Sequence, residues 1–200
     1  MPKKHIEINE DYYLSLYEII VGSDLRISSP EDLKSRFPNE YHKKEFLEFM
    51  GRKLYFEGFE SKAKLFLLEI GEEISGHDLY ILSVIFFYSE EYSEAESYFK
   101  LALNLGYTRS YYWLGYITEN GLGQCSDKQK AIEYYRSGAA CGYLMPHRSY
   151  LRLKHDESNL LGESIYRLKF FFLIVKASIL VIKNINDERL ADIPNYFEKK

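Results

Sequence analysis

Cysteine is scarce in this chain, with only Cys125 and Cys141 among 200 residues. The two lie sixteen positions apart, with no CxxC motif and no paired histidine, so the spacing predicts neither a zinc site nor a disulfide framework. The five histidines form no HxH or HxxxH motif. We therefore expect no bound metal and no cofactor, and we expect both thiols to be reduced.

Blocks of basic residues and long apolar runs are also absent. The net charge is −4 and no basic cluster stands out, so a nucleic-acid partner has little support. The longest apolar stretch, Phe170 to Ile182, is interrupted by Lys176. Its thirteen residues would span ~20 Å as a helix, short of the ~30 Å of a bilayer core. The N-terminus shows no signal-peptide pattern, so we expect a cytoplasmic protein without membrane insertion.

Catalytic motifs are missing as well. No GxGxxG follows a strand pattern and no GxxxxGK[ST] occurs, and Gly121-Leu-Gly123 lacks the lysine of a phosphate loop. No serine or cysteine has a histidine at a motif spacing, and the acid pairs fall at expected turns. We therefore expect no enzyme and assign no catalytic residue.

Aromatic residues, by contrast, are abundant: 19 Tyr, 13 Phe and one Trp. Tyrosine provides a large contact area at a low entropic cost, which favours a protein-binding role. The alternative is that the rings pack between helices, and for any one ring both interpretations stay open. For Trp113 we favour packing.

A repeat organises the middle of the chain. Ala63, Ala95 and Ala131 are each followed by large apolar or aromatic residues three and four positions later, and their spacings are 32 and 36. Upstream of each alanine, a large apolar residue precedes a small one; these pairs are Met50-Gly51, Leu82-Ser83 and Leu114-Gly115. We expect the small residues to let the two helices of a unit approach closely. Each unit is then a helix, a turn and a helix that must stack on its neighbours to bury its apolar face.

The second unit is expected to form helices over 77–88 and 92–105, separated by a turn at 89–91. The third has four extra residues between its helices, where Gly121 and Gly123 permit an open loop. Its first helix is expected over 110–119, and its second should start after Ser126, with Gln129 at a capping-box spacing. Gly106 and Gly142 are expected to end the second helices of these units.

The third unit resembles one full Sel-like repeat, a relative of the tetratricopeptide repeat. Its matching elements are Leu114-Gly115, Gly121-Leu-Gly123, Asp127, Lys130-Ala131, Tyr134-Tyr135, Ala139 and Gly142. Thr118 departs from the pattern, which usually has an aromatic residue there, and the fourth unit is degenerate around Pro146. The resemblance covers roughly residues 78–155. It implies an all-α, α/α superhelical solenoid that binds proteins and has no chemistry of its own.

The two ends lie outside the repeat. Asn9 is expected to cap a helix over 11–21, Ser29 to cap a short helix that stops by Pro38, and Asn39 to open the first helix of unit one. Residues 158–183 are expected to form one long helix. Because its middle, Phe170 to Val175, is apolar on every side, we expect a capping helix buried on more than one face. The alternative is that one face docks a partner or a second copy. In the polar tail, Ile193, Tyr196 and Phe197 are possible anchors.

The whole chain, 1–200, is expected to be one solenoid domain: N-terminal helices over 1–39, repeats over 40–157, and a C-terminal capping helix and tail over 158–200. Equivalent positions on the first helix of each unit should line a concave groove that changes from aromatic to basic. These residues are Tyr80, Val84, Phe87, Tyr112, Tyr116, Glu119, Arg148 and Arg152, with His155 one turn further on. A partner with an apolar anchor beside acidic groups would fit such a groove.

Three hypotheses follow for function. The first is a bacterial immunity protein that binds and neutralises a cognate toxin or effector. It rests partly on the resemblance, because small stand-alone proteins similar to this repeat family act in that role. The second is a signalling adaptor or secretion chaperone that bridges several proteins. The third is self-association, as a homodimer through the helix at 165–182.

Overall fold

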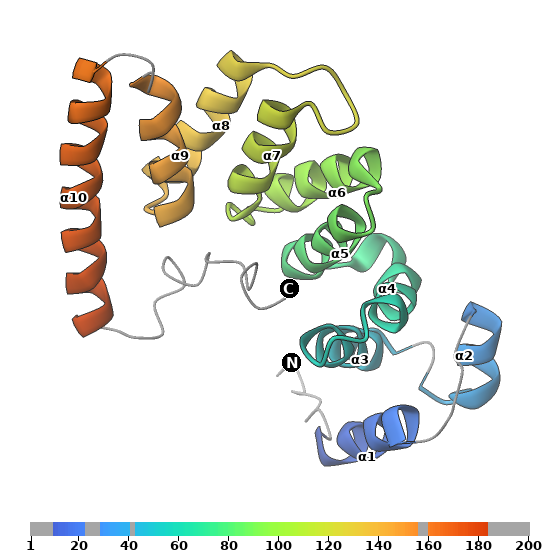
Figure 1. Ribbon diagram of the computed structural model, residues 1–200. Coiled ribbons are helices and arrows are strands. Elements are labelled where there is room, and N and C mark those ends of the chain that lie inside the picture. Colours follow the sequence, from blue (N-terminus) through green and yellow to red (C-terminus); the bar gives the residue numbers. More distant parts are fainter. Residues whose placement is uncertain (1–9, 23–28, 41–42, 156–159, 184–200) are drawn as a thin grey trace, which may run out of the picture.

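The computed structural model describes residues 10–22, 29–40, 43–155 and 160–183, and regular structure in these ranges is entirely helical. Figure 1 shows the helices following one another along an arc. Over these ranges the α-helices are α1 (Glu10–Gly22), α2 (Pro30–Arg36), α3 (Lys44–Phe56), α4 (Glu60–Glu69), α5 (Gly76–Tyr88), α6 (Tyr92–Asn104), α7 (Ser110–Asn120), α8 (Lys128–Ala140), α9 (Leu144–Lys154) and α10 (Leu160–Lys183). A short 3-10 helix, η1, spans Gly71–Glu73.

The predicted stacking of helix pairs is confirmed. The pairs α3–α4, α5–α6 and α7–α8 each pack closely as a unit, and α9 packs on α8 and on α10. Each unit contacts chiefly the units before and after it, so the chain forms an all-α solenoid without strands in its described ranges. Every helix therefore depends on its neighbours in sequence to cover its apolar side chains.

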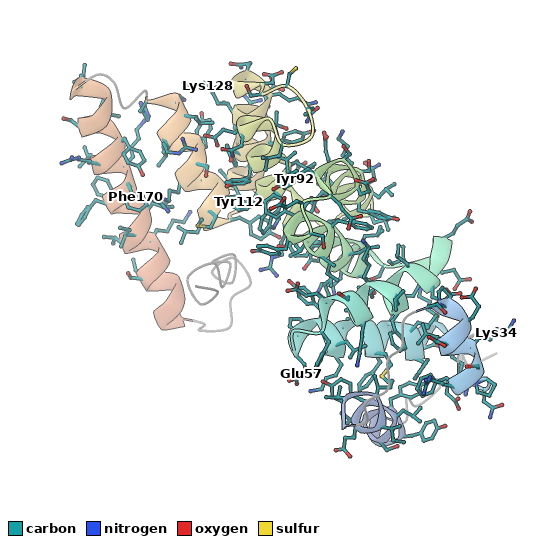
Figure 2. The ribbon with its side chains drawn as sticks, turned by 45° about the vertical axis from the view of Figure 1, so that its right-hand side comes forward. Lys34, Glu57, Tyr92, Tyr112, Lys128 and Phe170 are labelled. Carbon is teal, nitrogen blue, oxygen red and sulfur yellow. The ribbon has the colours of Figure 1, made fainter. Side chains whose placement is uncertain are left out.

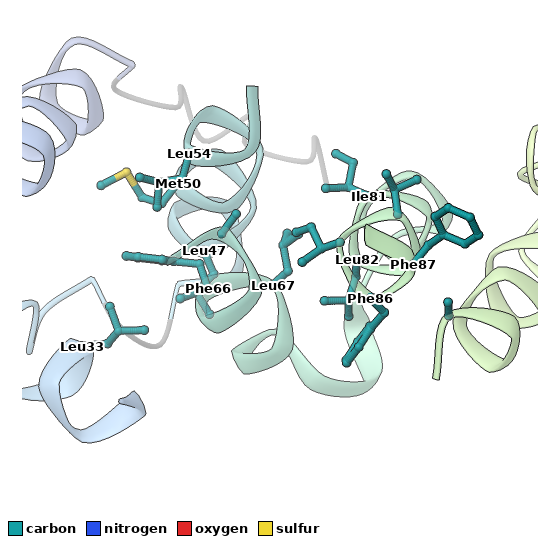
Figure 3. Close-up of a cluster of buried hydrophobic side chains, with 14 of the residues drawn as sticks. Leu33, Leu47, Met50, Leu54, Phe66, Leu67, Ile81, Leu82, Phe86 and Phe87 are labelled. Atoms are coloured by element: carbon teal, nitrogen blue, oxygen red, sulfur yellow. The ribbon is translucent and has the colours of Figure 1, made fainter. Parts of the chain in front are cut away.

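The core is densest around α5. Nine of its residues are buried, among them an unbroken run from Ile81 to Phe87. Figure 3 shows Leu82 and Phe86 of this helix beside Leu67, which comes from α4 of the preceding unit. The alanine column that defined the repeat is fully buried, at Ala63, Ala95 and Ala131.

The small-residue column has the predicted purpose. A Cβ atom on Gly51 would lie 2.5 Å from Leu67, and one on Gly115 would lie 2.6 Å from the Tyr135 ring. Both distances are too short for a side chain, so these glycines let the second helix of the unit lie against the first. Ser83 is fully buried at the equivalent position, and its hydroxyl donates a 2.6 Å hydrogen bond to the Leu79 carbonyl.

Two predicted helix starts are wrong. The cap of α8 is Asp127, not Ser126: its backbone is extended and its carboxylate accepts a 3.0 Å bond from the Lys130 amide, so Gln129 is not part of a capping box. The first helix of unit one begins at Lys44 instead of Asn39, because turn hydrogen bonds occupy this stretch, such as Glu40 N–H to the Phe37 carbonyl at 3.1 Å. The start at Ser29 is confirmed, since its hydroxyl accepts from the Asp32 amide at 3.3 Å.

The expectation of a capping helix buried on several faces is also wrong. One face of α10 packs on α9, with Leu173 buried and the Arg148 guanidinium 5.6 Å from the centre of the Phe170 ring. Other faces of α10 are open, because no other described helix lies against them closely. The predicted cap at Asn9 and the anchors at Ile193, Tyr196 and Phe197 lie outside the described residues.

Candidate partner-binding surface

The predicted surface lies on the first helices of successive units, but two of its residues belong to the core. Val84 and Phe87 are only 3% and 8% exposed, so the expectation that they face a groove is wrong. The Phe87 ring lies 4.7 Å from Trp113 and 5.5 Å from Tyr92, between centroids. These rings cover one another because unit two sits in the middle of the stack, with helices on both sides.

Tyrosines make up most of the partly exposed remainder. The Tyr80 hydroxyl accepts a 3.0 Å hydrogen bond from Trp113 Nε1, and the Tyr80 ring lies 4.9 Å from Tyr107. The Arg109 guanidinium lies 5.7 Å from the centre of the same ring. These contacts hold the Tyr80 ring in one orientation while part of it stays accessible.

Tyr112 and Tyr116 of α7 continue this surface, with ring centroids 6.3 Å apart and both side chains half-buried. Tyr112 is labelled in Figure 2, between the labels of Phe170 and Tyr92. Burial raises the pKa of Tyr112 to about 12, and the nearby hydroxyls of Tyr116 and Tyr88 add to that shift. Tyr112 is therefore neutral at physiological pH and can donate a hydrogen bond.

Three members of this surface were missed by the sequence analysis: Tyr55, Tyr88 and Tyr107. The Tyr107 ring lies 4.9 Å from Tyr80, and the Tyr88 ring lies 6.1 Å from Trp113, between centroids. Burial raises the pKa of Tyr55 to about 12, and the hydroxyls of Tyr88 and Tyr107 add to that shift. Tyr55 could have been found, because it stands four residues after Gly51, as Phe87 does after Ser83. We call this set the tyrosine face: Tyr55, Tyr80, Tyr88, Tyr107, Tyr112 and Tyr116.

An ion pair lies on the unit-one side of the tyrosine face. Arg52 donates from Nε to Asp78 Oδ1 at 2.5 Å and from Nη2 to Oδ2 at 2.7 Å. The Asp78 side chain is 0% exposed and also accepts a 2.6 Å bond from the Ser75 hydroxyl. This bidentate pair joins α3 of unit one to the start of α5 in unit two.

A second ion pair lies on the other side. Arg152 Nη2 donates to Glu119 Oε1 at 2.5 Å, and the Tyr135 hydroxyl donates to Glu119 Oε2 at 2.8 Å. Arg52 directly follows Gly51 of the small-residue column. Arg152 holds the equivalent place in unit four, because it directly follows position 151, which is 36 residues after Gly115. Glu119 and Arg152 were predicted to face a partner, but the structure pairs them with each other across the α7–α9 boundary.

Arg148 is exposed, and its guanidinium lies over the Phe170 ring. His155 is half-buried, with Nε2 3.0 Å from Lys169 Nζ. Its pKa is lowered by burial first and by the Lys169 charge second. Two of the predicted basic residues, Arg148 and His155, therefore contact α10.

Within the described ranges, no cluster of three His, Cys, Asp or Glu side chains could hold a metal ion. Over the same ranges, no helix combines the length and the apolar character that a membrane crossing needs. Cys125 and Cys141 are exposed and unbridged.

Comparison with known proteins supports the fold. No protein-family model matches the sequence, and no curated protein matches it either, so membership of the Sel-like family is not confirmed. The structure is similar to the crystal structure of the MamA protein, a tetratricopeptide-like helical repeat protein, with a TM-score of 0.56 at 20% sequence identity. The match covers 87% of this chain and 94% of MamA. The chain therefore has the fold of a tetratricopeptide-like solenoid.

Proposed function

We propose that this chain is a non-catalytic scaffold that binds a protein partner through its tyrosine face. The observation that carries the proposal is the gathering of six tyrosines from α3, α5, α7 and the α6–α7 turn. Their rings are held by neighbouring side chains, as Tyr80 is by Trp113 and Tyr107. Rings that are already ordered lose little entropy when a partner covers them, which is why tyrosine is enriched at binding hot spots.

Positive charge near the tyrosine face favours a partner that carries acidic groups. Arg109 lies over the Tyr80 ring, and Arg148 lies over the Phe170 ring and acts electrostatically on Tyr112. A segment with an apolar anchor flanked by carboxylates would place the anchor against the rings and the acids against the guanidinium groups.

Two narrower hypotheses concern the biological role. In the first, the partner is a toxin or effector that the chain neutralises in the bacterial cytoplasm, as an immunity protein; it rests on the sequence resemblance to Sel-like repeat proteins. The second is an adaptor or secretion chaperone. One feature favours it: α10 carries an exposed apolar face separate from the tyrosine face, so a second copy of the chain can dock on α10 while each tyrosine face holds a partner.

Affinity capture from the cells that make this protein tests the proposal. The double variant Tyr88→Ala/Arg148→Ala removes an exposed member of the tyrosine face and an exposed arginine, whereas Leu101→Ala removes an exposed apolar group from α6. We expect the double variant to lose a protein that the wild type and Leu101→Ala both capture, with circular dichroism unchanged. Equal capture by all three forms would contradict the proposal. Identification of the captured protein by mass spectrometry separates a toxin from several adaptor partners.

A further inference from the structure

The exposed faces of α10 carry an unusual amount of apolar surface. Seven of its large apolar side chains are 41–68% exposed: Leu161, Leu168, Phe171, Phe172, Ile174, Val175 and Ile179. Contiguous apolar patches of this kind mark interaction sites on soluble proteins, because leaving them in water is costly. The patch lies on an outer helix of the stack, where α9 is its main described neighbour (Figure 1).

The spacing of these residues indicates what covers them. Leu161, Ile165, Leu168, Phe172, Val175 and Ile179 follow one another at alternating steps of four and three, which is the heptad pattern of a coiled coil. Ile165, Phe172 and Ile179 take the a positions, and Leu161, Leu168 and Val175 take the d positions. We call these six residues the seam. Leu173, which is buried, lies off the seam.

A seam of this geometry fits another helix. The helix α10 has 24 residues, which corresponds to ~36 Å. A helix lying along it could insert its own side chains between seam residues over nearly that whole length, as knobs into holes. A β-hairpin or an irregular peptide would match neither the straight path nor the 3.5-residue period.

The residue types at the seam favour a second copy of this chain. Ile occupies two of the three a positions and Leu two of the three d positions, a combination that favours two parallel strands. A two-fold axis along the seam would place each residue opposite its own counterpart, which is the self-complementary contact of most homodimers.

The charged edge of the seam selects the orientation. Lys169 and Lys176 are exposed and follow d positions, so they take the e positions, while Ser164, Phe171 and Ser178 take the g positions. In an antiparallel pair e faces e, and the lysines of the two copies would repel each other. In a parallel pair e faces g, so each lysine meets a serine or a phenylalanine.

We propose that two copies of this chain form a homodimer in which their α10 helices pair in parallel along the seam. The dimer buries the exposed apolar patch and carries two tyrosine faces, one on each solenoid. It does not depend on the identity of the partner that the tyrosine face binds.

Light scattering after size-exclusion chromatography measures the association directly. We expect the wild type to have twice the chain mass of 23.7 kDa, and Phe172→Asp/Val175→Asp to have the single-chain mass with unchanged helicity. Leu101→Asp is the matched control, because Leu101 is exposed on α6, far along the chain from the seam; it should remain a dimer. A monomeric wild type at every concentration tested would overturn the proposal, as would a double variant that is still dimeric.

Disulfide trapping then tests the orientation. In a background with Cys125→Ser and Cys141→Ser, the variants Leu161→Cys and Ile179→Cys each place one thiol at an end of the seam. Parallel helices bring like positions together, so each variant should form a disulfide-linked dimer by itself on oxidation. If cross-links form only when the two variants are mixed, residue 161 of one copy meets 179 of the other. That result would overturn the parallel arrangement.

Discussion

The middle of the solenoid and its C-terminal end contain helices of similar apolar content, yet the structure treats them differently. The run Ile81 to Phe87 in α5 is fully buried, whereas Phe171, Phe172, Ile174 and Val175 in α10 are exposed. The difference lies in the neighbours: α5 packs on α3, α4 and α6, and α10 packs chiefly on α9. An apolar run thus shows that a helix needs covering, and the number of adjacent helices decides whether its own chain covers it.

Truncating one aliphatic side chain in each region tests this difference in burial directly. We expect Leu82→Ala in α5 to lower the free energy of unfolding by about 3 kcal/mol, because it leaves a cavity among fully buried neighbours. Ile174→Ala in α10 should cost no more than about 0.5 kcal/mol, because that side chain is half in water and lies off the seam. Urea unfolding followed by circular dichroism measures both values. Similar losses in the two variants would mean that α10 is covered to the same extent as α5.

The two inter-unit ion pairs use arginines at equivalent repeat positions but differ in the burial of the carboxylate. Removing the guanidinium with Arg52→Met leaves the Asp78 carboxylate with no exposure to water, so we expect a loss of about 2 kcal/mol. Arg152→Met leaves Glu119, which is 17% exposed and keeps its bond from Tyr135, so the loss should be about 1 kcal/mol. Both losses of unfolding free energy are calculated from the shift in the urea midpoint, with the dependence of that free energy on urea concentration unchanged. A larger loss at Arg152 would reverse this ranking of the two boundaries.

The last prediction concerns tyrosine ionisation in the middle of the chain, which leaves stability at neutral pH unchanged. Tyr55 and Tyr112 have folded pKa values of about 12, raised from 10.0 by burial. Because the folded values lie above the unfolded value, their contribution to stability is fully present below pH 10 and is lost as the pH rises toward 12. Tyrosinate absorbance should therefore show some tyrosines titrating later in the native protein than in urea. A single titration near pH 10 with the fold intact would contradict the burial of these two hydroxyls.

Much of the fold follows from local sequence rules. The alanine and glycine columns, the Ser29 cap and the long last helix were predictable because each depends on a few residues close in the chain. The cap of α8 was missed by one position. Ser126 and Asp127 are both good caps, and the extended backbone that selects Asp127 is set by the loop, whose Asp127 amide donates to the Thr118 carbonyl at 3.0 Å.

The candidate surface was harder to predict. A residue's position in the repeat indicates the direction in which its side chain points, but not whether a neighbouring unit buries that side chain. Tyr80 and Phe87 lie on the same helix, α5, and both were predicted to face the groove. The Phe87 ring is enclosed by Trp113 and Tyr92, whereas the Tyr80 side chain is partly exposed to solvent. Similarly, the Glu119–Arg152 pair depends on the angle between units three and four. Such angles come from side-chain packing across a boundary and are not written in any one unit.

The step-by-step stacking of units also has a mechanical consequence. Each unit contacts chiefly its neighbours, so small rotations at successive boundaries between units add up. The distance between α1 and α10 therefore depends on the sum of these rotations. The Arg52–Asp78 and Arg152–Glu119 pairs cross two of these boundaries and restrict rotation there. The stretch between them is joined by packed rings, such as Phe87 and Trp113 with centroids 4.7 Å apart, so a change in the curvature of the arc requires these rings to repack.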